Sequence, residues 1–112
     1  DGDGQKIILR GNNAVSLATA FNWYLKYTCR VHVSWFGNQL KLPAKLPQPL
    51  QRERRIINGK YRVYMNYCTV SYTAAWWNWE RWQQELDYMA MNAINMPLFS
   101  VGLDGVWYIA AF

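Results

Sequence analysis

The feature that most constrains this chain is a change of hydrophobic period within its second half. Residues 61–67 alternate as a strand does, and residues 79–93 repeat apolar side chains at three- and four-residue steps, as one face of a helix does. Residues 96–101 form a short apolar run that is typical of a buried strand. This order predicts two parallel strands joined by a crossover helix. Two strands cannot bury both faces of a sheet, so we expect further chain to cover them.

The first part of the chain shows a similar change of period. Residues 5–10 are predicted to be a strand, residues 14–28 a helix that either Asn12 or Asn13 caps, and residues 31–35 a second strand. A turn and a short strand at 39–42 follow. The pattern indicates a small β-α-β unit, and the whole chain is predicted to be α/β.

Three prolines separate these two parts. Pro43, Pro47 and Pro49 are followed by a charged cluster and by Asn58-Gly59, which indicates an extended connector. We therefore predict an α/β N-terminal domain at 1–45, a connector at 46–60 and a second unit at 61–112.

Charge and chain ends give weaker constraints. The formal net charge is +5, but the basic residues are dispersed, and the densest cluster, at 52–55, is typical of a solvated loop. No helix-turn-helix or RNA-binding pattern accompanies it, which argues against a nucleic-acid partner. No apolar run is long enough for a membrane span. The first residues show no signal-peptide pattern and do not begin with Met, so we expect the chain to be processed, trimmed or excerpted. Residues 106–112 resemble a helix without a stop signal, so we expect the natural protein to continue.

The carboxylates do not form a convincing catalytic pair. Glycosidases use two facing carboxyl groups about 5–10 Å apart. Glu80 and Asp87 are predicted on the solvated side of the helix, and Glu85 can pair with Arg81, four residues before it. Asp104 follows a predicted strand end and is the best catalytic candidate of the seven carboxylates, but a helix cap is the favoured interpretation.

The residues with metal or redox chemistry are few. Cys29 and Cys68 lie in no metal-binding spacing, so we predict neither a metal site nor a cofactor, and a single disulfide between them stays open. His32, the one histidine, lies in a predicted strand, where a structural role is more common than a catalytic one.

A polar set follows the predicted strand at 61–67. Asn66 and Cys68 are two residues apart, which places them on one face of that strand, and Tyr72 follows in the next loop. In β/α folds, ligands bind at the carboxyl ends of the strands. These three residues are therefore candidates for binding a hydroxylated ligand, with ordinary packing at a strand end as the alternative.

Longer motifs are more specific. They are Tyr-Arg-Val-Tyr-Met-Asn-Tyr-Cys-Thr-Val-Ser-Tyr-Thr at 61–73, Trp-Trp-Asn-Trp-Glu-Arg-Trp at 76–82, the continuation at 85–98, and His-Val-Ser-Trp-Phe-Gly-Asn-Gln-Leu at 32–40. Together they resemble the α-N-acetylglucosaminidases of glycoside hydrolase family 89. The match runs in order over nearly the whole chain, and its many Trp and Tyr residues make it specific.

This resemblance implies a small α/β domain followed by the first two β/α units of a (β/α)8 TIM barrel. It implies a retaining enzyme that removes terminal N-acetyl-α-D-glucosamine from heparan-sulfate-like or mucin-type glycans, without a cofactor. Both catalytic glutamates are expected beyond Phe112, so no catalytic residue is assigned here. Asn66, Cys68 and Tyr72 match positions that line the sugar pocket. The resemblance also implies a secreted, periplasmic or lysosomal protein, with the remainder of the barrel as partner.

The chain departs from the family pattern at three places. Asn78 replaces an aspartate, Ala93 replaces a glycine, and Gly102-Leu103-Asp104-Gly105 replaces Gly-Gln-Glu-Ala. These changes keep one alternative open, a carbohydrate-binding protein without activity on the same scaffold. The aromatic, basic composition gives a further and less favoured alternative, a binder of nucleic acid, which a steep salt dependence of binding would reveal.

Overall fold

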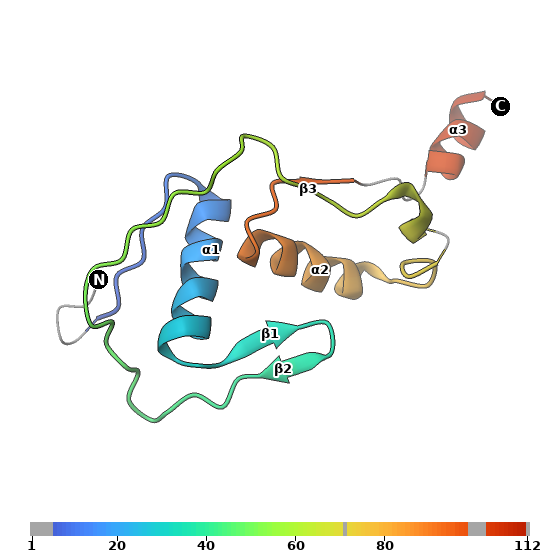
Figure 1. Ribbon diagram of the computed structural model, residues 1–112. Coiled ribbons are helices and arrows are strands. Elements are labelled where there is room, and N and C mark those ends of the chain that lie inside the picture. The colour runs from blue at the N-terminus through green and yellow to red at the C-terminus, as the bar shows by residue number, and fades with distance from the viewer. Residues whose placement is uncertain (1–5, 71, 99–102, 112) are drawn as a thin grey trace.

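The computed structural model describes residues 6–70, 72–98 and 103–111. Its dimensions are 62 × 30 × 19 Å, and Figure 1 shows the N-terminal elements at one end and the last helix at the other. The order is α1 (Ala14–Trp23), η1 (Tyr24–Thr28), β1 (His32–Ser34), β2 (Gly37–Gln39), β3 (Val63–Tyr64), η2 (Tyr67–Val70), α2 (Trp79–Met91), β4 (Met96–Pro97) and α3 (Leu103–Ala111). The predicted α/β class is confirmed.

The first helix forms where its period predicts it. Asn13 caps α1, because its Oδ1 accepts a hydrogen bond from the Ser16 backbone N–H at 2.8 Å. The helix continues into η1, a π-helical turn, so helix covers the whole predicted range 14–28. Arg30 ends it in the left-handed region, with φ of 56°.

The strands of the N-terminal part differ from the prediction. In the segment 6–10, side chains alternate between exposed and half-buried as expected, but only Ile7 forms an isolated bridge and no strand forms. The predicted strand at 39–42 lies instead at 37–39 and pairs antiparallel with β1. The chain reverses through Trp35 and Phe36, and Gly37, with φ of 131°, adopts a backbone conformation that other residues avoid. The β-α-β unit is thus a helix followed by a hairpin.

The core of this part joins the two halves of the chain. Tyr24, Leu25, Cys29 and Val31 are buried together, and Ile7, Leu9 and Met91 pack against them. Met91 is the last residue of α2, so the second half contributes to the first core. The Thr19 hydroxyl and the Asn22 amide also donate to the carbonyls of Ala90 and Met91 at 3.1 and 3.0 Å. Side chains of α1 thereby satisfy carbonyls at the end of α2.

The predicted parallel pair is confirmed, but it is short. Val63 pairs with Met96 and Tyr64 with Pro97. The Asn95 side chain sets this register, because it accepts a hydrogen bond from the Arg62 backbone at 2.8 Å and donates to the Lys60 carbonyl at 2.9 Å. Residues 99–101 of the second predicted strand lie outside the described residues.

The helices of the second half agree with their predicted positions. Within α2, Trp82 and Met89 are buried, whereas Trp79 at its start is exposed. Asp104 lies in the first turn of α3, and its side chain is outside the described part of the chain. None of the helices in the described ranges is long and apolar enough to cross a membrane.

Ala93 ends α2 in the left-handed region, with φ of 67°. The left-handed backbone conformation costs an alanine about 1–2 kcal/mol in steric strain. Glycine adopts this conformation without strain, but it loses more backbone entropy than alanine on folding, which offsets part of the gain. We expect Ala93→Gly to raise the free energy of unfolding by about 0.5–1 kcal/mol. The matched control is Ala90→Gly, inside the same helix, which should lower it by about 1 kcal/mol. Denaturant titrations measure both. A destabilised Ala93→Gly variant would contradict this conformation.

Ionisation of the Tyr24 phenol makes the free energy of unfolding depend on pH in the alkaline range. Burial, with a smaller contribution from the neighbouring Cys29, raises the pKa of Tyr24 to about 12. Its hydroxyl donates to the Pro47 carbonyl at 2.9 Å. The folded state therefore keeps a proton that the unfolded chain releases near pH 10. The contribution of Tyr24 to the free energy of unfolding is complete below about pH 10 and is lost as the pH rises towards 12.

We expect Tyr24→Phe to be less stable than the wild type at pH 8, and this difference to shrink at pH 11. Comparing the two proteins at each pH cancels the titration of other groups. A difference that is the same at both pH values would show that the Tyr24 phenol is not protected from ionisation.

Candidate functional site: the carboxyl end of β3

A left-handed residue redirects the chain directly after β3. Met65 has φ of 72°, and the next residues form η2 rather than the predicted continuation of the strand to 67. Asn66 and Cys68 therefore do not share the face of one strand, and that prediction is wrong. A turn places them instead at the end of β3, where both side chains are exposed.

Asn66 organises this turn. Its Oδ1 accepts hydrogen bonds from the Thr69 backbone N–H at 3.1 Å and from the Thr69 hydroxyl at 3.2 Å. Within the described ranges, the Nδ2 of Asn66 donates to no protein group, so its two hydrogens are available to a ligand. The carbonyl side of the amide is thus fixed by Thr69, and the residue as a whole is exposed.

The segment after Asn66 presents aromatic side chains. Tyr67, Tyr72, Trp76 and Trp79 are all exposed, Trp76 by 95%. Ala74 is buried and holds this loop, since its N–H donates to the Thr69 carbonyl at 2.8 Å. Flat rings beside hydrogen-bonding groups suit a ligand with apolar faces and hydroxyl edges, as sugars have.

Of the other two predicted binding residues, Cys68 lies within this turn and Tyr72 lies after it. Cys68 is in η2 and Tyr72 begins the loop that leads to α2. Cys68 is exposed while Cys29 is buried, and both thiols are free.

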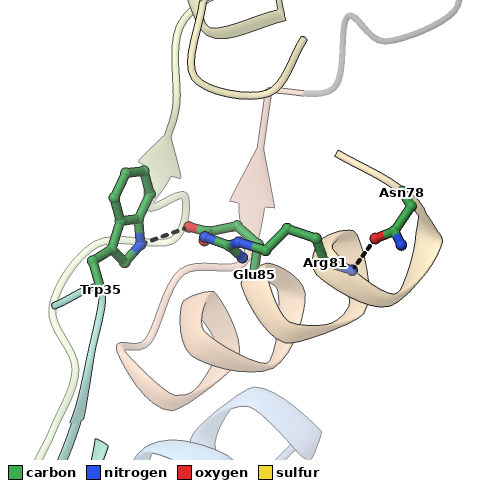
Figure 2. A network of polar contacts seen from close by, with 4 residues as sticks. All are labelled: Trp35, Asn78, Arg81 and Glu85. Carbon is green, nitrogen blue, oxygen red and sulfur yellow. Dashed lines mark hydrogen bonds and ion pairs between the residues drawn. The ribbon is translucent and has the colours of Figure 1, made fainter. Parts of the chain in front are cut away.

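A buried carboxylate lies behind this loop, and sequence reasoning missed its environment. Glu85 is 1% exposed and forms the predicted pair with Arg81, whose Nη2 lies 2.9 Å from its Oε2. The Trp35 indole N–H also donates to its Oε1, with 3.2 Å between the heavy atoms. Figure 2 shows these side chains converging from the hairpin and from α2. Trp35 lies 50 residues upstream, so helical spacing gave no signal for this contact.

The charged and aromatic groups around Glu85 form one cluster. The Arg81 guanidinium lies 4.0 Å from the centroid of the Trp77 ring, which packs edge-on against Trp82. Burial, and to a smaller degree the Glu85 charge, raises the pKa of Tyr64, the last residue of β3. The Glu85 carboxylate thus extends from α2, contacts the β1–β2 hairpin through Trp35, and affects the ionisation of Tyr64 at the end of β3.

No catalytic pair appears among the described carboxylates. Glu80 and Asp87 are exposed on α2 as predicted, and Glu85 is neutralised by Arg81. The side chains of Asp1, Asp3 and Asp104 lie outside the described residues. Across 6–70, 72–98 and 103–111, no three His, Cys, Asp or Glu side chains gather as metal ligands.

A cleft lies apart from this site. It has a volume of about 800 Å³ and is bounded by residues 7–13, by α1 and by the connector. Its lining is basic, and Glu53 within it accepts a hydrogen bond from the Trp23 indole at 2.8 Å. Figure 1 places these segments at the end of the molecule opposite η2 and α3.

These observations define a class of protein, an α/β chain with a parallel strand pair joined through α2 and with a polar and aromatic turn after the first strand of that pair. Comparison with protein families specifies it further. Residues 1–48 match the alpha-N-acetylglucosaminidase (NAGLU) N-terminal domain, and residues 62–111 match the tim-barrel domain of the same proteins. The chain belongs to the α-N-acetylglucosaminidase family.

Individual relatives agree. The chain is 39% identical to human alpha-N-acetylglucosaminidase over 106 residues, which are 95% of this chain and 14% of the human protein. A family 89 glycoside hydrolase of Clostridium perfringens in complex with 2-acetamido-1,2-dideoxynojirimycin is 37% identical, with a TM-score of 0.89 over 95% of this chain and 12% of that one. A doubly Glu→Gln-substituted form of the enzyme, in complex with GlcNAc-α-1,4-galactose, is 38% identical with a TM-score of 0.84, over 88% and 11% of the two chains. This chain therefore spans about a seventh or less of these relatives.

Asn78, where the family resemblance led us to expect an aspartate, is the N-cap of α2. Its Oδ1 accepts a hydrogen bond from the Arg81 backbone N–H at 3.0 Å and so caps α2 (Figure 2). We expect Asn78→Ala to lower the free energy of unfolding by about 1 kcal/mol, and Asn78→Asp to keep or slightly raise it. Thermal or denaturant unfolding measures both variants. An Asp variant as unstable as the Ala variant would show that capping is not what this position provides.

Proposed function

We propose that this chain is part of a retaining exo-glycosidase that hydrolyses terminal N-acetyl-α-D-glucosamine from glycans. The observation that carries the proposal is the continuous 39% identity to human alpha-N-acetylglucosaminidase over 95% of the chain. The bacterial relative bound to GlcNAc-α-1,4-galactose supports a glycan with an α-linked N-acetylglucosamine as substrate. Heparan-sulfate-like and mucin-type glycans are the natural candidates, in a secreted, periplasmic or lysosomal setting.

In this proposal, the catalytic glutamates come from barrel strands outside this chain. Such an enzyme needs one carboxyl group as nucleophile and another as acid and base, and the described carboxylates provide no such pair. The chain contributes the small N-terminal domain at 1–45, the connector at 46–60 and the first barrel elements from 61 onwards. Its functional contribution is to bind and orient the sugar.

Asn66, Cys68 and Tyr72 are proposed to contact the sugar. The free Nδ2 of Asn66 can donate to a hydroxyl or to the acetamido oxygen, and the exposed phenol of Tyr72 can donate or accept. Cys68 is a weak polar group and acts mainly through shape. A buried sugar group left without a partner loses about 1–3 kcal/mol of binding.

The first test compares two proteins with a chromogenic N-acetyl-α-glucosaminide. We expect the protein from the complete reading frame to hydrolyse it and the 112-residue chain alone to be inactive. Turnover by the short chain, lost in Asp104→Asn or Glu80→Gln, would mean that the catalytic groups lie here. A complete protein that binds the sugar without cleaving it would support the carbohydrate-binding alternative.

The second test addresses the binding residues in the complete protein. We expect Asn66→Ala to lower kcat/KM about tenfold, the equivalent of ~1.4 kcal/mol, because a hydrogen bond to the sugar is lost. Cys68→Ser should have a milder effect. Glu80→Gln, on the exposed face of α2, is the control and should change little. A silent Asn66→Ala together with a strongly impaired Glu80→Gln would place the pocket elsewhere.

A further inference from the structure

Glu85 is the one buried charged side chain among the described residues. A carboxylate out of water costs several kcal/mol unless charges and hydrogen bonds compensate it. Arg81 supplies the charge at 2.9 Å, and Trp35 supplies a hydrogen bond at 3.2 Å from the β1–β2 hairpin, outside the barrel elements. The position of Arg81 is therefore tied both to its own helix and to the N-terminal part of the chain.

From Glu85, packed contacts lead towards the loop before α2. The Arg81 guanidinium lies over the Trp77 ring at 4.0 Å and at a greater distance, 5.7 Å, from the Trp35 ring. The two indoles themselves meet edge-on, with 6.0 Å between their centroids. Trp77 is thus held on two sides by groups that Glu85 orients.

From Trp77, backbone hydrogen bonds continue to the candidate sugar site. The Trp77 N–H donates to the Ala74 carbonyl at 3.1 Å, and the Ala74 N–H donates to the Thr69 carbonyl at 2.8 Å. The Thr69 N–H and hydroxyl in turn donate to Asn66 Oδ1. Every step between Glu85 and the Asn66 amide is therefore a direct contact.

We propose that Glu85 is a positioning residue for the sugar site, which holds the Asn66 amide in its binding orientation through Arg81, Trp77 and the Ala74–Thr69 turn. The N-terminal hairpin takes part through Trp35, so it contributes to sugar affinity without touching the sugar. This inference rests on the proposed function, because it deepens the role assigned to Asn66.

Trp35→Phe tests the proposal in the protein from the complete reading frame, because it removes the indole donor and keeps an aromatic ring. We expect the KM for the chromogenic substrate and the Ki of 2-acetamido-1,2-dideoxynojirimycin to rise by about three- to tenfold, with kcat changed by less than about twofold. A purely structural role would lower the melting temperature and leave KM and Ki unchanged.

Trp23→Phe is the matched control. It removes the same kind of bond, from an indole N–H to a carboxylate, at 2.8 Å to the exposed Glu53 beside the basic cleft. We expect it to leave Ki unchanged. An equal rise of Ki in Trp23→Phe and Trp35→Phe would overturn the proposal, because it would mean a general loosening of the N-terminal part.

A double-mutant cycle gives the second measurement. If Glu85 acts through Asn66, Glu85→Gln should raise Ki about three- to tenfold in the wild-type background and by less than about twofold in an Asn66→Ala background. Effects that multiply in the double variant would overturn the proposal.

A wild-type protein without turnover or inhibitor binding would instead refute the proposed function, whereas an active protein with unchanged Ki in Trp35→Phe refutes this inference alone.

Discussion

The buried carboxylate of Glu85 is the group on which the arrangement of the two halves depends. The side chain is 1% exposed and forms an ion pair with Arg81, and removing one partner of a buried ion pair costs about 3–5 kcal/mol. Trp35 donates a neutral hydrogen bond to the same carboxylate, and leaving a buried acceptor without such a bond costs about 1–3 kcal/mol, so Glu85 favours packing of the β1–β2 hairpin beside α2. Together with the contact of α1 side chains to the end of α2, this makes the N-terminal part a support for the barrel elements.

The parallel pair β3–β4 is the second constraint. Asn95 and Arg62 fix its register, and the Arg62 guanidinium also binds the carbonyls of Gly59 and Ala93. Two strands cannot close a barrel, so Val63 and Met96 stay exposed, as do the described apolar side chains of α3. The chain spans 14% of its human relative, and under the proposed function the remaining barrel strands would cover these side chains.

The helices could be predicted from the sequence because their signals are local. Period and capping asparagines place α1 and α2 within one or two residues, as Asn13 and Asn78 show. The strands were predicted too long, because an alternating side-chain pattern does not show where the partner strand ends. It also does not show that the backbone of Met65 adopts the left-handed conformation. The lost strand at 6–10 has the same cause, since its side chains alternate but no neighbour completes a ladder.

The site could be predicted only in part. The position of Asn66 after β3 follows from the order of elements, whereas its orientation follows from Thr69 and the turn. The pairing of Glu85 with Arg81 follows from helical spacing, but its burial depends on Trp35, and no local pattern records a partner 50 residues away. Long-range contacts of this kind decide which of several polar residues on a helix becomes buried.

The most direct measurement is a crystal structure of the protein from the complete reading frame with 2-acetamido-1,2-dideoxynojirimycin bound. We predict the inhibitor at the carboxyl end of β3, with the Asn66 Nδ2 within about 3.2 Å of one of its oxygens and the Trp35–Glu85 hydrogen bond intact. An inhibitor bound in the basic cleft between α1 and the connector, or bound with Asn66 out of reach, would contradict it.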